Sequence, residues 1–182
     1  MPDVRIIKTK RNIRQAFFAL LRQTTYNNVT VDMLCKEALC SRSTFYVHYS
    51  GKDDLLKEIV AVYVEKFRTH FKNRLSHYDS NNFFKIINVV NTHFIIPNQS
   101  ELTLLFESEE IDNYFSKQLE AIFNAAYLTH YHVTNQQTIL PTLYAINATT
   151  ILKSLIKNRV SDTDLLLISQ FQESILTNLP HD

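Results

Sequence analysis

The sequence is poor in residues that interrupt helices. Among its 182 residues there is one glycine, Gly51, and there are four prolines. Hairpins and tight turns usually need glycine at positive φ, so this scarcity argues against a strand-rich fold and for helices joined by short polar loops. A glycine-rich phosphate-binding loop is excluded for the same reason, because such loops need several glycines.

Long apolar runs are also absent. No run approaches the length of a membrane span, and residues 1–10 lack the apolar stretch of a secretory signal. We therefore expect a cytoplasmic protein with no membrane partner. The two cysteines, Cys35 and Cys40, are too few for the disulfide framework of a secreted protein. They are either small apolar side chains packed around a helix turn, which is the simpler interpretation, or a redox-sensing pair.

Signals of enzyme chemistry are missing as well. His130 and His132 are two residues apart, which on a helix directs them to different faces, and neither has a Cys or His partner at metal-ligand spacing. The sequence contains no nucleophile elbow and no paired-carboxylate signature. We expect no catalytic residue, no bound metal and no cofactor.

Charge is divided unevenly along the chain. Residues 1–52 contain nine Lys or Arg and three Asp or Glu, a net charge of +6. The other 130 residues contain ten basic and fifteen acidic side chains, a net charge of −5, so the whole chain is close to neutral. A basic segment on a neutral protein is typical of a chain that places one end on a polyanion.

The apolar residues recur at the three-four spacing of amphipathic helices. This pattern predicts an all-α fold of about nine helices, with a helix that stops before Pro97. We expect residues 1–51 to form a domain of three helices that contains a helix-turn-helix, and residues 52–182 to form a second helical domain that begins with a long helix. The predicted helices span about residues 8–23, 31–38, 42–48, 52–75, 82–95, 100–107, 109–131, 137–157 and 161–178.

The stretch from Thr30 to Leu56 carries the functional signal. Thr30 and Ser41 are suitable N-caps for two helices too short to stand alone, which a tight turn separates. The second helix of such a pair can enter the major groove of DNA. Phe45 and Tyr49, which are four residues apart, can pack in the core. The side chains left outside suit base edges and phosphates, although a solvated helix face would have the same composition: Arg42, Ser43, Thr44, Tyr46, Val47 and His48.

Lys52 is unusual because a lysine in the first turn of a helix opposes the helix dipole. Its position makes sense if the ammonium and the free N–H groups of the helix together hold a DNA phosphate. Thr30 could approach a phosphate in the same way while it caps its helix, but a plain N-cap explains Thr30 equally well.

Taken together, these residues resemble the TetR family of bacterial regulators. The resemblance lies in Thr30-Val31, in the stretch from Ser41 to Tyr49 (Ser-Arg-Ser-Thr-Phe-Tyr-Val-His-Tyr), and in Lys52-Asp53-Asp54-Leu55-Leu56. It is strong over residues 8–60, whereas beyond residue 60 only length and helix rhythm match. The family usually has glycine in the turn where this chain has Leu39. If that turn needs positive φ, leucine costs about 1 kcal/mol or more, and otherwise the turn is reshaped.

The resemblance implies a double-stranded DNA partner and roles for individual residues. Arg42, Ser43, Thr44 and Val47 would face bases. The backbone would be held mainly by Thr30, Tyr46, His48 and Lys52, with Arg5, Lys8 and Arg11 as additions.

The resemblance also implies a homodimer through the last two helices, which would read a palindrome, and a cavity for a small-molecule effector among the middle helices. The expected function is a repressor that the effector releases from its operator. The alternative is a coactivator or chromosome-organising factor whose C-terminal domain binds protein. Candidate ligand-binding residues, for which plain core packing is the competing explanation, are His93, Phe106, Glu107, Tyr114, Phe123, Tyr144 and Asn147.

Overall fold

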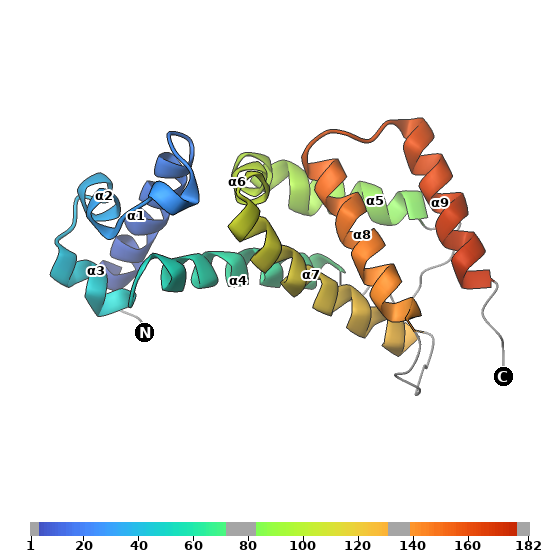
Figure 1. The fold of residues 1–182 in the computed structure, drawn as a ribbon, viewed down its shortest axis with the longest axis horizontal. Coiled ribbons are helices and arrows are strands. Elements are labelled where there is room, and N and C mark those ends of the chain that lie inside the picture. The colour runs from blue at the N-terminus through green and yellow to red at the C-terminus, as the bar shows by residue number, and fades with distance from the viewer. Residues whose placement is uncertain (1–3, 72–82, 131–138, 178–182) are drawn as a thin grey trace. The chain divides into compact units, whose positions relative to one another are not determined.

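The fold is all-α, as the composition predicts, and Figure 1 shows it in a computed structural model that describes residues 4–71, 83–130 and 139–177. Residues 72–75 of the predicted helix 52–75, and His132, lie outside the described residues. The chain divides into two compact units. One contains Met1–Glu65 and Ser100–Phe115, and the other contains Lys66–Gln99 and Ser116–Asp182. These units are not the functional domains expected from the sequence, 1–51 and 52–182, which stay a prediction.

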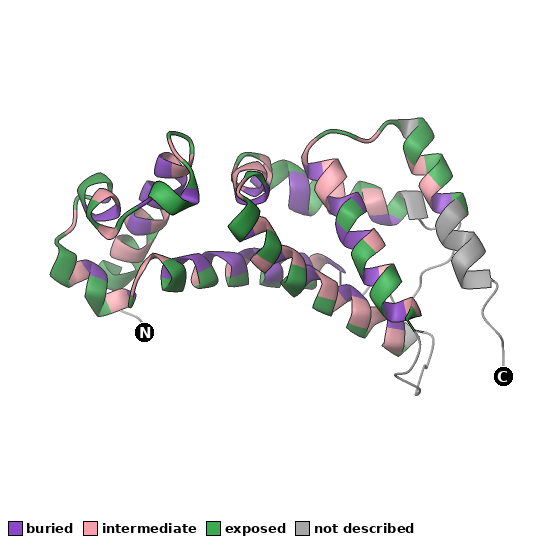
Figure 2. Cartoon of the chain, viewed as in Figure 1, coloured by how far each residue is buried: buried purple, intermediate pink, exposed green. Residues whose placement is uncertain are grey.

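The first unit begins with the helices of the predicted helix-turn-helix: α1 (Val4–Leu21), the single turn η1 (Tyr26–Asn28), α2 (Val31–Glu37), α3 (Arg42–His48) and the start of α4 (Lys52–Phe71). Their predicted core residues are buried, and Ile13, Phe17, Leu34, Phe45 and Leu55 have no exposed surface. Figure 2 shows the resulting pattern on α4, where buried and exposed residues alternate along the helix. The apolar spacing of the sequence therefore locates this core.

Both predicted N-caps are confirmed. The Thr30 hydroxyl accepts a hydrogen bond from the Met33 backbone N–H at 3.2 Å, and the Ser41 hydroxyl accepts one from the Thr44 N–H at 3.1 Å. Each bond satisfies one of the free N–H groups at a helix start, and such a cap stabilises a helix by about 1 kcal/mol. Helices of only seven residues depend on such caps.

The turn between α2 and α3 has the positive φ that the family pattern requires. Leu39 has a φ of 54°. The Cys40 N–H donates to the Cys35 carbonyl at 3.0 Å and the Leu39 N–H donates to the Lys36 carbonyl at 3.3 Å. These two bonds define a Schellman motif, in which the left-handed position is usually occupied by glycine. The backbone keeps the shape that glycine favours, so the strain is carried by Leu39.

One prediction for the second unit, a helix end before Pro97, is wrong. The helix expected to stop before Pro97 continues through it: α5 (Phe83–Val90) leads into a π-helical turn at Asn91–Ile95 and then into α6 (Ile96–Glu107). The Ile96 N–H donates to the Asn91 carbonyl, five residues back. Proline lacks an N–H and clashes with the carbonyl four residues before it in a regular α-helix. The wider π-turn changes that spacing just before Pro97, so the chain stays helical.

Aromatic side chains fill much of the second unit. Phe67 is central, with ring centroids 4.8 Å from Phe71, 5.2 Å from Phe94 and 5.5 Å from Phe123. The remaining helices of the chain are α7 (Glu109–His130), α8 (Leu140–Ile156) and α9 (Asp162–Thr177). Over the described residues, no helix combines the length and the hydropathy needed to cross a membrane.

Candidate nucleic-acid interface

Helix α3 separates its side chains as the sequence predicts. Phe45 and Tyr49 are buried, whereas the outward residues Tyr46 and Val47 are 48% and 78% exposed. Arg42 and Ser43 are exposed as well, and Thr44 and His48 are half-buried. The helix therefore presents a guanidinium, hydroxyl groups and a phenol on a face that its own core does not use.

Arg42 is oriented by a residue that the sequence argument missed. Its guanidinium forms an ion pair with Asp32 of α2 at 2.9 Å and lies 6.0 Å from the centroid of the Tyr46 ring. The hydrogen bond with Tyr46, followed by the negative charge of Asp32, raises the pKa of Arg42 above its usual value. Since both partners of the ion pair are more than half exposed, the pair contributes little stability. The ion pair instead restrains the direction of the Arg42 side chain, which is held beside α3.

The hydroxyl groups at the start of α3 form a small cluster. The Ser41 hydroxyl is 2.8 Å from the hydroxyls of both Ser43 and Thr44. Because a hydroxyl can donate one bond and accept two, these side chains keep capacity for another partner. Ser43, which is exposed, is better placed for such a partner than the half-buried Thr44.

A polar network holds the end of α3 against α1 and α4. The Tyr49 hydroxyl donates to the Glu58 carboxylate at 2.7 Å, and Lys10 forms an ion pair with the other carboxylate oxygen. Burial raises the pKa of Glu58, but the hydrogen bonds from Lys10 and Tyr49 outweigh burial, so the pKa lies below its usual value. The Lys10 ammonium also lies 5.2 Å from the centroid of the Tyr49 ring. The C-terminal end of α3 is therefore held by two other helices, α1 and α4.

Lys52 has an internal role that the sequence argument did not anticipate. Its ammonium donates to the backbone carbonyls of Tyr26 and Asn27 at 3.0 and 3.1 Å and lies 4.6 Å from the centroid of the Tyr26 ring. Tyr26 is itself buried and donates to Asp53. These contacts explain a lysine at the start of α4 without a DNA phosphate. An ammonium has three N–H donors, so at most one remains for a phosphate.

The other expected backbone contacts are on the surface. Thr30 is exposed while its hydroxyl caps α2. Arg5, Lys8 and Arg11 are exposed on the first turns of α1, which begins four residues earlier than the sequence predicts. No contact with DNA is needed to explain the placement of these three side chains.

The candidate ligand residues fall into two sets. Phe106, Glu107 and Tyr114 belong to the first unit, and the other four belong to the second. Phe106 and Phe123 are buried in aromatic clusters, which agrees with plain core packing. His93 is exposed and stacks on His70 with ring centroids 5.9 Å apart.

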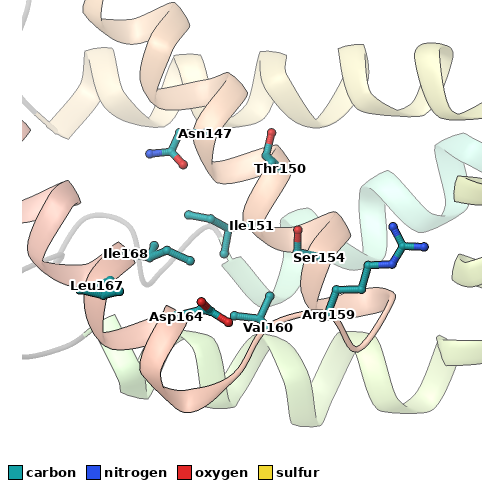
Figure 3. A pocket seen from close by; sticks show the side chains of 9 residues that line it. All are labelled: Asn147, Thr150, Ile151, Ser154, Arg159, Val160, Asp164, Leu167 and Ile168. Carbon is teal, nitrogen blue, oxygen red and sulfur yellow. The ribbon is translucent and has the colours of Figure 1, made fainter.

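Asn147, from the second set, lines an open pocket of about 410 Å³ between α8 and α9. Figure 3 shows Asn147, Thr150, Ile151 and Ser154 on α8, opposite Asp164, Leu167 and Ile168 on α9. Arg159 and Val160, from the connection between the two helices, close one end. The pocket combines apolar walls with charged and amide groups.

Helices α2 and α3, with the exposed polar residues of α3, have the arrangement of a helix-turn-helix, a motif that binds DNA in other proteins. Comparison with known families gives the same result, because residues 13–59 match the family model described as bacterial regulatory proteins, tetR family. Residues 13–59 are therefore similar to the helix-turn-helix segment of TetR-family regulators, which supports a DNA-binding regulator.

Comparisons over the whole chain support the fold. The solved structure titled "Dihydroxyacetone kinase operon activator DhaS" is similar over 93% of this chain and 94% of its own, with a TM-score of 0.51 and 18% sequence identity. At this identity the likeness concerns the fold alone. No curated protein matches the sequence.

Proposed function

We propose that the protein is a dimeric repressor that reads a palindromic operator with α3 and is released by a small-molecule effector. The observation that carries this proposal is the outward face of α3, where Arg42, Ser43, Tyr46 and Val47 are exposed beside a fully buried Phe45. An arginine restrained by Asp32 can form the bidentate contact with a guanine edge that is the commonest specific contact to DNA.

The proposed contacts divide by chemistry. Arg42, Ser43, Thr44 and Val47 face bases, and the Val47 side chain offers an apolar surface to a thymine methyl group. Phosphates are held by Thr30, Tyr46, His48 and, through its remaining N–H, Lys52, with Arg5, Lys8 and Arg11 as further candidates.

The dimer would form through α8 and α9. Large apolar side chains at Ile139, the N-cap of α8, and at Leu143 and Ile146 on α8 recur at spacings of four and three residues and are 65%, 48% and 47% exposed. On α9, Leu166 and Leu167 are 49% and 58% exposed. Exposed apolar residues gathered on two neighbouring helices mark a protein interface. A two-fold dimer would place two copies of α3 about 34–36 Å apart, one turn of DNA.

Hydrogen bonds within the first unit support a route by which an effector would act. Side chains of α6 and α7 are bonded to residues around the helix-turn-helix: Tyr63 donates to Glu101 at 2.9 Å, Arg22 donates to Ser100 at 3.2 Å, and Asn27 donates to Glu110. A ligand that shifts α6 or α7 would therefore act on the loop that precedes α2.

The test is selection of bound sites from random double-stranded DNA by the full-length protein. We expect a palindrome with half-sites one turn apart and an affinity that falls steeply with salt, because phosphate contacts release counterions. Enrichment of an unpaired half-site would contradict the dimer, and no enrichment at all would contradict sequence-specific binding.

A second candidate function is activation through a protein contact. The structurally similar DhaS is titled an operon activator, and the exposed leucines of α9 would also suit a protein partner. Transcription from a promoter that carries the selected site distinguishes the two, because a repressor lowers transcription there and an activator raises it.

A further inference from the structure

The two cysteines occupy the two contact positions of the Schellman motif that joins α2 to α3. Cys35 is the third residue from the end of α2, and Cys40 follows the left-handed residue Leu39. The hydrogen bond from the Cys40 N–H to the Cys35 carbonyl, 3.0 Å long, fixes the two backbones next to each other. In this motif the side chains at these two positions commonly form an apolar contact. Here both side chains carry sulfur.

The two thiols are neighbours in the fold. Both are free cysteines, Cys35 being buried and Cys40 half-buried. Burial, together with the neighbouring Cys35 thiol and a hydrogen bond to it, raises the pKa of Cys40. Packing as small apolar groups would explain the burial of Cys35, but it does not require a second sulfur at the half-exposed position.

We propose that Cys35 and Cys40 are a site of reversible oxidation by hydroperoxides, which closes a disulfide across the helix-turn-helix turn. The half-buried Cys40 is the side chain that a peroxide can reach. Its thiolate attacks the O–O bond to give a sulfenic acid and releases water, or an alcohol from an organic peroxide. The Cys35 thiol then attacks this sulfur, the S–S bond forms, and the sulfenic hydroxyl leaves as water. Two thiols are thus oxidised and one peroxide is reduced.

Closure of the disulfide would disturb the start of α3. The sulfur atoms must approach from non-bonded contact to about 2.05 Å. Cys35 is held in the core, so the movement falls on Cys40, which directly precedes the N-cap Ser41. The position of Arg42 depends on that cap. This consequence rests on the proposed function, and it predicts that oxidation weakens operator binding by about tenfold, or about 1.4 kcal/mol.

Formation of the disulfide is tested without DNA. The reduced full-length protein is treated with hydrogen peroxide and then with a thiol-alkylating reagent, and its intact mass and its peptides are measured. We expect an intramolecular Cys35–Cys40 bond that a dithiol reverses, formed faster at higher pH because the reacting thiolate becomes more abundant. Unchanged thiols, a sulfinic acid, or disulfide-linked dimers as the main product would overturn the proposal.

Cys40→Ser is the matched variant, because it removes one sulfur at a half-exposed position and forms no disulfide; Cys35→Ala serves the same purpose from the buried side. Binding to the selected DNA site should fall on oxidation of the wild type and stay unchanged in Cys40→Ser. If the disulfide forms and binding to DNA does not change, the proposed effect of oxidation on DNA binding is wrong. If the reduced wild type binds no sequence, the proposed function fails, while the mass measurement still decides the disulfide.

Discussion

The α2–α3 corner and the α8–α9 corner are built from the same backbone devices and present different surfaces. Each first helix ends in a Schellman motif with a left-handed residue that is not glycine, Leu39 with φ 54° and Asn158 with φ 51°. At α8 the Arg159 N–H donates to Ser154 and the Asn158 N–H donates to Leu155, at 2.9 and 3.1 Å. Each second helix then begins with a serine N-cap, Ser41 or Ser161.

The side chains on the second helix distinguish the corners. Arg42, Ser43 and Tyr46 are polar and exposed on α3, whereas α9 exposes Leu166 and Leu167. Local geometry therefore does not decide what a corner binds. A polar exposed face suits DNA, and an apolar exposed face suits a second protein surface.

The largest effect is expected from a charge on the apolar face. Leu167→Glu would place a carboxylate in the proposed dimer interface, so the protein should become monomeric and its operator affinity should fall by about 10²–10⁴-fold, the loss of a bivalent contact. Light scattering gives the molar mass, and titration with the selected DNA gives the affinity. Leu167→Met keeps an apolar side chain of similar size and should leave both values unchanged. A dimeric Leu167→Glu protein would contradict this role of α9.

A smaller effect is expected from the polar face of α3. Arg42→Ala should relax the base preference at one position of each half-site by about 1–3 kcal/mol, because a bidentate contact to a base edge is lost. Asp32→Asn keeps Arg42 but frees it, so the preference should relax less. Binding to DNA variants at that position measures both effects. If Arg42→Ala weakens every variant equally, Arg42 contacts the backbone and not a base.

Replacing Leu39 and Asn158 by glycine compares the backbone strain of the two turns. Leu39→Gly should raise the free energy of unfolding by about 1 kcal/mol, since it removes the strain of a leucine at positive φ. Asn158→Gly should change stability by only a few tenths of a kcal/mol, because asparagine tolerates this conformation. Denaturant unfolding of the two variants tests the difference. Equal changes would show that the two turns are equally strained.

The smallest effect is expected from a change of pH at the N-caps of α3 and α9. Ser161 donates hydrogen bonds to Asp164 through its hydroxyl and its N–H, which lowers the pKa of Asp164. A lowered pKa means that the carboxylate stabilises the start of α9 above its ordinary pKa, and this contribution is lost as the pH falls through the lowered value. The cap of α3, from Ser41 to Thr44, contains no titrating group.

Amide hydrogen exchange near Ser161 should therefore accelerate as the pH falls below about 4, relative to exchange near Ser41, after correction for the intrinsic rate. Asp164→Asn should remove this pH dependence. The same acceleration at both corners would show that the effect comes from global unfolding.

Local signals in the sequence predicted the caps at Thr30 and Ser41 and the division of α3 into buried and exposed faces. They did not reveal the partners of Lys10, Arg42 and Lys52, because Glu58, Asp32 and the carbonyl of Tyr26 are brought close only by the fold. Tyr26 lies between two predicted helices, and only its tertiary contacts show that it is buried. The prediction that a helix ends before Pro97 was wrong. It holds for a regular α-helix, whereas a π-helical turn precedes this proline.

We propose that α3, and not the chemically different α9, contacts DNA. The most direct measurement is the shift of backbone amide NMR signals when the selected DNA is added to the full-length protein. We expect the largest shifts at Arg42–Val47 and little change at Leu166 and Leu167. Shifts concentrated on α9, with Arg42–Val47 unchanged, would contradict the assignment.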